Sequence, residues 1–197
     1  MSLEEYKNKR KFNKTPEPKG EIKKTDKNIF VIQKHDASNL HYDFRIELDG
    51  VLKSWAVPKG PSLNPSQRRL AVETEDHPID YAEFEGIIPE DEYGGGYVIV
   101  WDLGTFENIT EKDAEKVSLK QAYENGHITI LLNGIRLKGE FALIKTKREE
   151  QWLLIKKGDS EANREINITK KYQDSVLSNK TIDDLKKTKK GNLDKFL

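Results

Sequence analysis

The segment Leu40–Leu48, followed directly by an Asp-Gly pair, constrains the fold more than any other part of the chain. Apolar and polar side chains alternate through it, as they do in a strand that packs one face on a core. Asp-Gly between two such runs is a strong signal for a two-residue hairpin turn, so Val51–Val57 is predicted to return as the paired strand. The chain is therefore expected to contain an antiparallel sheet of fixed register.

Other short β-type runs are separated by turn residues, and helix signals are scarce. The predicted strands are Ile29–His35, Leu40–Leu48, Val51–Val57, Arg69–Glu75, Tyr97–Asp102, Ile128–Asn133, Arg136–Lys145 and Gln151–Lys157. Short helices are predicted at Leu3–Lys11, Ser118–Glu124 and Thr181–Lys189, the last with a capping box. Many short strands joined by tight turns predict a mainly β fold, an antiparallel barrel or a sandwich.

The chain divides into three parts by composition. Residues 1–28 are a Lys-rich arm with 9 basic and 5 acidic side chains, residues 29–157 hold the predicted strands, and residues 158–197 are a charged segment with a short helix. We expect one structural domain. The net charge is zero, but both ends are basic and the middle is acidic. This pattern fits simple solvation, or basic ends that approach a polyanion while carboxylates hold a cation.

Several classes of protein and site are excluded or disfavoured. The absence of cysteine excludes disulfides, thiol catalysis and Cys-based zinc sites. The polar N-terminus and the lack of a long apolar run predict a cytoplasmic protein with no membrane association. We find no P-loop, no nucleophile elbow and no ligase Lys-x-Asp-Gly motif; residues 47–50 begin with Glu.

The polar face of the Leu40–Leu48 strand carries His41, Asp43, Arg45 and Glu47. The hairpin register predicts that Asp43 lies opposite Ala56 and that Arg45 lies opposite Ser54. Small neighbours leave room above this face, as a ligand pocket requires.

His35 ends the preceding strand and is separated from Leu40 by the short linker 36–39. A hairpin there would bring His35 beside His41 and Asp43. Two imidazoles and one carboxylate would form a three-ligand metal site with open positions, which suits Mn, Zn or Fe better than Ca. The alternative is an exposed polar strand face without a metal.

Other polar residues have a functional and a structural interpretation each. Arg45 could clamp phosphate oxygens or pair with Glu47 or Asp43. His77, predicted to follow a strand, could contact phosphate or protonate a leaving oxygen, or it could cap a turn. Tyr81 could donate a hydrogen bond or pack. Lys59, held between prolines, could contact phosphate or be an ordinary surface lysine.

Three strings resemble the 3′-phosphoesterase module of bacterial and archaeal DNA ligase D: FVIQKHDASNLHYDFRIELDGVLKSWAVPKGPS, EDHPIDYAEFEGIIPEDEYGGG and VIVWDLGTF. Shorter strings, KGEFALIK, WLLIKK and SVLSNKTIDDL, extend the resemblance toward the C-terminus. The ligase and polymerase modules of that protein are absent from these 197 residues, which fits a free-standing member or an excised piece.

The resemblance implies a compact antiparallel β-barrel with an extended N-terminal arm and a surface active site. It implies a hydrolase that uses Mn²⁺ to remove a 3′-terminal ribonucleoside from a DNA primer and then hydrolyses the 3′-phosphate, in break repair by non-homologous end joining. Zn²⁺ or Co²⁺ could occupy the same site. The implied substrates are primer-template 3′ ends, with a ligase and a Ku-like protein as partners. We expect a monomer.

The resemblance also assigns residues. The metal ligands fall on His35, His41 and Asp43, and the phosphate-contacting groups fall on Arg45, His77 and Lys59. Tyr81, Gln33, Arg10 and Glu17 also match active-site positions. At Lys11 the family pattern has Asp, a reversal of charge that bears on the diesterase step. The alternatives to this function are a non-catalytic DNA-binding adaptor and a small-molecule phosphatase.

Overall fold

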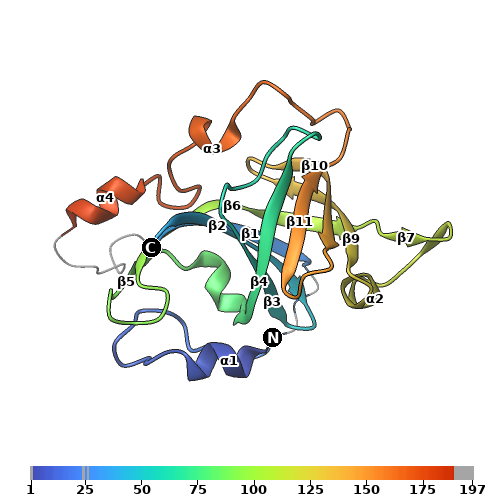
Figure 1. Cartoon of the computed structure of the whole chain (residues 1–197). Coiled ribbons are helices and arrows are strands. Elements are labelled where there is room, and N and C mark those ends of the chain that lie inside the picture. Colours follow the sequence, from blue (N-terminus) through green and yellow to red (C-terminus); the bar gives the residue numbers. More distant parts are fainter. Residues whose placement is uncertain (1, 24, 26, 189–197) are drawn as a thin grey trace.

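The computed structural model describes residues 2–23, 25 and 27–188, and its strands close into an antiparallel barrel of eight (Figure 1). The barrel strands are β1 (Ile29–Asp36), β2 (Leu40–Leu48), β3 (Val51–Val57), β4 (Arg68–Pro78), β6 (Gly96–Asn108), β9 (His127–Gly134), β10 (Lys138–Lys145) and β11 (Gln151–Lys156). They follow one another in the order β1-β2-β3-β4-β11-β10-β9-β6, and a β1–β6 pairing closes the ring. The predicted mainly β barrel is therefore confirmed.

Every predicted strand exists, but several boundaries differ. β4 runs on to Pro78 and β6 to Asn108, whereas β10 begins at Lys138 rather than Arg136. The elements that the sequence did not predict are β5 (Gly86–Ile88), β7 (Glu111–Lys112), β8 (Glu115–Lys116), the 3₁₀ turn η1 (Ile79–Glu83) and α3 (Ile168–Lys171). All are of five residues or fewer, too short for periodicity to reveal.

The three predicted helices are present in shortened form as α1 (Leu3–Asn8), α2 (Leu119–Glu124) and α4 (Ile182–Lys187). Thr181 and Asp184 form the predicted capping box of α4, and Ser118 forms another at α2. Lys189, the predicted end of the last helix, lies outside the described residues. In the described part of the chain, no helix has the length and apolar character needed to cross a membrane.

The first two hairpins have the register that the sequence predicts. Asp43 pairs with Ala56 and Arg45 with Ser54, and His35 pairs directly with His41 across the β1–β2 hairpin. Alternation then places Phe44, and the residues of β2 two positions before and after it, in the barrel interior. The core there includes three tryptophans.

The opposite face of β1–β4 is covered rather than exposed. Tyr6 of α1 and Tyr81 of η1 belong to a second apolar cluster, which packs on Val31 and Leu52 outside the barrel. Figure 1 shows α1 and the green turn that follows β4 on the same flank of the barrel, away from α2. The basic arm thus contributes a helix to the fold. Because this cover lies over the polar face of β2, that face becomes a partly enclosed cleft.

One irregularity in β4 decides which side chains reach this cleft. Leu52 pairs with His77 and Ser54 pairs with Thr74, so two steps along β3 match three along β4. A bulge of one residue reverses the alternation of side chains beyond it. Glu75 and His77 therefore line the same cleft as Thr74.

Candidate metal centre

The two imidazoles and the carboxylate at the start of the β1–β2 hairpin converge. One ligand atom each from His35, His41 and Asp43 lies within 4.8 Å of the others. His35 Nδ1 is 3.5 Å from Asp43 Oδ2, and His41 Nε2 is 3.7 Å from Asp43 Oδ1. The direct His35–His41 pairing across the hairpin produces this arrangement.

Backbone carbonyls fix the tautomer of both histidines. His35 Nε2 is 2.8 Å from the Gly94 carbonyl oxygen, and His41 Nδ1 is 2.8 Å from the Asn39 carbonyl oxygen. A carbonyl only accepts, so these nitrogens carry the protons. The lone pairs of the neutral rings are then on His35 Nδ1 and His41 Nε2, the two atoms that face Asp43.

This arrangement fits a divalent metal. Three electron-pair donors that face one another repel unless a cation lies between them. Metal-binding histidines commonly donate their second N–H to a backbone carbonyl, as both do here. The set of two imidazole nitrogens and one carboxylate oxygen suits Mn²⁺, Zn²⁺ or Fe²⁺ and leaves positions for exogenous ligands.

Asp43 is 6% exposed and stays ionised because of its neighbours. Burial alone would raise the pKa of its carboxyl, but the guanidinium of Arg45 outweighs burial and holds the pKa below its ordinary value. Arg45 Nη2 lies 3.1 Å from Asp43 Oδ2. The carboxylate is therefore available as an anionic ligand.

Three contacts hold the guanidinium of Arg45. Its Nε donates to Gln33 Oε1 at 2.9 Å, Nη1 lies 3.0 Å from His77 Nδ1, and Nη2 pairs with Asp43. Its central carbon also lies 5.0 Å from the centroid of the Tyr81 ring. A guanidinium has five N–H donors, and Gln33 and Asp43 engage one each, so donors remain for an anion in the cleft. The structural interpretation of Arg45, an ion pair with Asp43, is present, and its contact with phosphate stays a prediction.

Gln33 accepts a hydrogen bond from Arg45 but does not itself line the cleft. It is fully buried, and its Nε2 donates to the carbonyl oxygens of Tyr81 and Phe84 at 3.0 and 2.9 Å. These bonds orient its Oε1 toward Arg45. Gln33 thus connects η1 with the charged face of β2.

His77 lies inside β4 and not in a loop after it, so the predicted loop position is wrong because the strand continues to Pro78. Its Nδ1 contacts Arg45, Ser54 Oγ at 3.3 Å and the Glu75 carbonyl oxygen at 2.9 Å, and its Nε2 is 3.4 Å from Arg10 Nη2. Burial and the two arginines hold the pKa of His77 well below its ordinary value. The free cleft therefore contains a neutral imidazole.

The arm brings Arg10 and Glu17 into the same network. Arg10 Nε donates to Glu17 Oε1 at 2.8 Å, and Arg10 Nη1 donates to Glu75 Oε1 at 3.0 Å. Glu17 also accepts from Thr15 Oγ1 at 2.8 Å and from the Tyr81 hydroxyl at 3.0 Å. The carboxylate of Glu17 therefore connects the arm to η1.

Sequence reasoning missed Glu75 and Tyr6. Glu75 accepts from both Lys9 and Arg10, and the fully buried ring of Tyr6 lies 3.9 Å from the guanidinium carbon of Arg10. Residues that are two apart in a strand share a face. Extending the predicted strand to His77 would therefore have placed Glu75 on the same face as His77. Tyr6 had no local signal.

The cleft above these residues has a volume of about 200 Å³. The residues that line it are Arg10, His35, Ala37, His41, Asp43, Arg45, Ala56, Thr74, Glu75, His77, Tyr81, Ile88, Tyr93 and Gly94. Arginines, histidines and two tyrosines thus surround an open space next to the candidate metal ligands.

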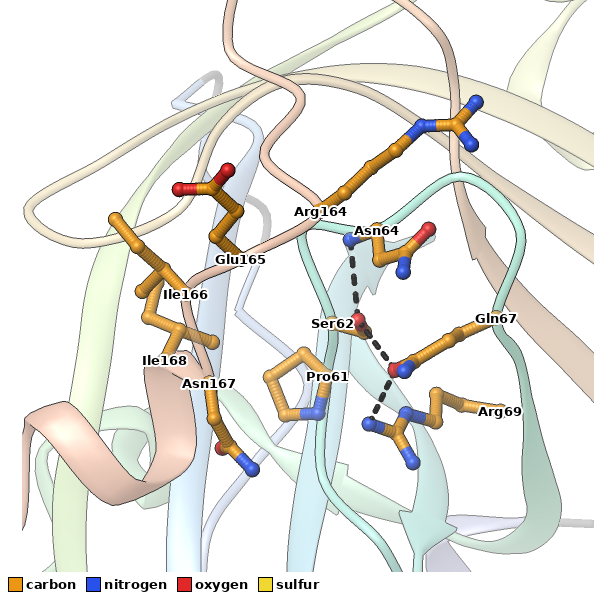
Figure 2. A pocket seen from close by; sticks show the side chains of 10 residues that line it. All are labelled: Pro61, Ser62, Asn64, Gln67, Arg69, Arg164, Glu165, Ile166, Asn167 and Ile168. Carbon is orange, nitrogen blue, oxygen red and sulfur yellow. Dashed lines mark hydrogen bonds between the residues drawn. The ribbon is translucent and has the colours of Figure 1, made fainter.

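Like Gln33 and Glu17, Lys59 is a predicted site residue that does not line the cleft. It is exposed beyond the end of β3. A separate pocket of about 120 Å³ lies near that end of the hairpin, between the β3–β4 loop and the segment before α3 (Figure 2). There Arg69 Nη2 and Ser62 Oγ both donate to Gln67 Oε1, at 2.6 and 2.8 Å. None of the predicted site residues lines this second pocket.

Known proteins match most of the chain. The sequence model of the DNA ligase D 3′-phosphoesterase domain matches residues 33–145. The multifunctional non-homologous end joining protein LigD of Pseudomonas aeruginosa is 47% identical over 188 residues, which cover 91% of this chain and 22% of that protein. The LigD DNA repair protein of Mycobacterium tuberculosis is 48% identical over 153 residues, or 77% of this chain and 19% of that protein. The chain therefore spans about a fifth of the length of these relatives.

Proposed function

The chain belongs to the DNA ligase D 3′-phosphoesterase family, and on that premise we propose that it hydrolyses phosphoesters at the 3′ ends of DNA. The observation that carries the proposal is the convergence of His35, His41 and Asp43 beside the guanidinium of Arg45, in a cleft open to solvent. We propose Mn²⁺ as the metal, with Zn²⁺ or Co²⁺ as substitutes.

A divalent ion bound by His35, His41 and Asp43 would act as a Lewis acid toward a phosphate oxygen. The chain's own groups then have separate tasks. Arg45 donates its remaining N–H groups to the phosphate and offsets charge that develops in the transition state. Arg10, fixed by Glu17 and Glu75, adds a second positive charge on the opposite side of His77.

His77 would bind the phosphate by donating a ring N–H to one of its oxygens. An arriving phosphate anion offsets the charge of Arg45 and Arg10 and raises the pKa of the ring, which allows it to transfer a proton to the leaving oxygen. Tyr81 keeps Glu17 and the arm in place through its hydroxyl. We propose that Lys59 contacts a phosphate of the DNA strand where that strand continues beyond the cleft.

The substrate end that we propose carries either a 3′-terminal ribonucleoside or a 3′-phosphate. Removal of the ribonucleoside leaves a 3′-phosphate, and its hydrolysis leaves a 3′-hydroxyl. The relatives are named as end-joining and DNA repair proteins, so we place this activity in the repair of DNA breaks. A DNA ligase and a Ku-like protein are the proposed partners, and a monomer is the proposed form.

A gel assay with a 5′-labelled DNA primer tests the proposal. The primer ends in one ribonucleotide, is paired to a longer template and is incubated with Mn²⁺ or with EDTA. We expect shortening to a 3′-phosphate and then to a 3′-hydroxyl species with Mn²⁺ alone. Asp43→Asn should abolish both steps. Asp49→Asn is the matched control, because Asp49 is exposed in the β2–β3 turn and Asn tolerates its positive φ of 53°.

Two other results would redirect the proposal. DNA binding that needs no metal, without hydrolysis by any divalent ion, would support a non-catalytic adaptor. Equal hydrolysis of a small phosphate ester and of a primer 3′-phosphate would support a small-molecule phosphatase. Full activity of the Asp43→Asn protein would reject the metal ligands themselves.

A further inference from the structure

An exposed aromatic ring stands at the rim of the cleft. Among the large apolar side chains that are exposed in the described residues, Tyr93 is the one aromatic, with 49% of its surface accessible. It lines the same cleft as His41 and Asp43. Exposure of an aromatic face to water is unfavourable. An exposed ring beside a ligand cleft is therefore suited to pack against an apolar surface of the ligand.

The loop before β6 fixes the backbone position of Tyr93. Two successive turns define the loop, with Glu92 N donating to the Pro89 carbonyl at 3.0 Å and Gly95 N donating to the Glu92 carbonyl at 3.0 Å. A side chain on Gly95 would come within 2.7 Å of the Pro89 oxygen, so only glycine permits this path. Gly94, which directly follows Tyr93, binds His35 through its carbonyl. Tyr93 is therefore one residue from an anchor of the candidate metal cluster.

Two cations accompany the ring. Lys9 Nζ is 3.4 Å from the Tyr93 hydroxyl and 4.8 Å from the ring centroid, and the guanidinium carbon of Arg10 is 5.6 Å from the centroid. A half-exposed ring with two cations over it matches the chemistry of a nucleotide, which presents a flat base next to an anionic phosphate.

We propose that Tyr93 is a stacking platform for the nucleoside that lies beyond the scissile phosphate. This inference rests on the proposed function and deepens it. Tyr93 then acts as a specificity-determining residue for ends that carry a terminal ribonucleoside. A 3′-phosphate end has no base beyond its phosphate, so it gains nothing from the ring. The platform assists the diesterase step and leaves the monoesterase step unaffected.

Paired kinetics on the two kinds of end test this proposal. Tyr93→Leu keeps apolar bulk but removes the π face, and Tyr93→Phe keeps the face but removes the hydroxyl. For a primer that ends in a ribonucleoside, we expect Tyr93→Leu to raise KM about tenfold, because base–aromatic stacking in nucleic-acid complexes has this order of strength. Tyr93→Phe should stay within about twofold of the parent chain. For a 3′-phosphate primer, both variants should match the parent.

A binding measurement adds a readout that is independent of turnover. A primer with 2-aminopurine riboside as its last nucleoside is titrated with protein in EDTA, and the fluorescence of that base is recorded. Stacking on an aromatic ring quenches this fluorescence. We expect quenching by the parent and by Tyr93→Phe, and its loss in Tyr93→Leu. Ile135→Ala, which changes an exposed apolar side chain outside the cleft, should behave as the parent does.

Specific results would overturn the proposal. An equal rise in KM for both kinds of end in Tyr93→Leu would show that the ring only maintains the cleft. Loss in Tyr93→Phe as large as in Tyr93→Leu would assign the effect to the hydroxyl and its bond to Lys9. If the parent hydrolyses neither end, the proposed function fails, whereas the fluorescence titration still decides whether the terminal base stacks on Tyr93.

Discussion

Replacement of Glu17 by Gln should release the N-terminal arm without unfolding the barrel. The side chain of Glu17 has no exposed surface, and its carboxylate accepts three hydrogen bonds, from Arg10, Thr15 and Tyr81. Gln has the same shape, but it lacks the charge and must direct an amide donor toward one of these donors. The barrel strands pair with one another between Ile29 and Lys156, so release of the arm breaks none of their backbone pairing.

The size of the effect follows from the bonds lost. A hydrogen bond to a charged group contributes about 1.5–3 kcal/mol, and a buried donor left without an acceptor adds about 1–3 kcal/mol of destabilisation. Arg10 keeps Glu75 as a partner, which reduces the loss. We therefore expect docking of the arm to weaken by about 3 kcal/mol, which raises the undocked fraction about 100-fold.

Amide hydrogen exchange measures this change directly. In Glu17→Gln, exchange at Leu3–Asn8 should accelerate about 100-fold relative to the parent, while the strands of the barrel keep their protection. Glu21→Gln is the control, since Glu21 is exposed on the same arm. Unchanged exchange in the arm would refute the reasoning, and so would equal acceleration in arm and barrel.

Three further predictions concern the cleft. Arg45→Lys keeps the charge but not the directed N–H contacts, so kcat should fall about 100-fold or more while Mn²⁺ affinity is retained; a loss of less than fivefold would contradict the assignment. Because the pKa of His77 lies well below its ordinary value, the ring is neutral when folded and takes up a proton on unfolding. Stability in urea should therefore fall as the pH drops below about 6.5, by at most about 1.4 kcal/mol per pH unit, and His77→Asn should remove that part of the slope; an unchanged slope would contradict it. Lys11→Asp, which restores the acid of the family pattern, should increase removal of a ribonucleoside relative to hydrolysis of a 3′-phosphate in the gel assay, and an unchanged ratio would contradict this.

The part of the site that lies on the first two hairpins could be predicted from the sequence. Alternation through Leu40–Leu48 and the Asp-Gly turn specify strand, face and register within a few residues, so Asp43 lies opposite Ala56 as expected. The short 36–39 linker likewise predicts the proximity of His35 and His41. Each of these contacts depends on local turn chemistry, which a single sequence expresses clearly.

The remainder of the site depends on interactions between distant segments. The bulge in β4 turns Glu75 and His77 toward the cleft. The alternation of apolar and polar residues does not indicate where a strand contains one extra residue. Docking of the arm joins Arg10 to Glu75, which is 65 positions away, through burial of Tyr6 that its own neighbours do not specify. Here tertiary packing decides the structure, so the resemblance to the family supplied residues that patterning could not.

Binding of Mn²⁺ tests the central claim, that His35, His41 and Asp43 form a metal centre. Electron paramagnetic resonance reports free Mn²⁺ in a titration of the parent chain, of Asp43→Asn and of Asp49→Asn. We predict one strong site per chain in the parent and in Asp49→Asn, and its loss in Asp43→Asn. Retention of that site in a folded Asp43→Asn protein, or no Mn²⁺ site in the parent, would contradict this account of the cleft.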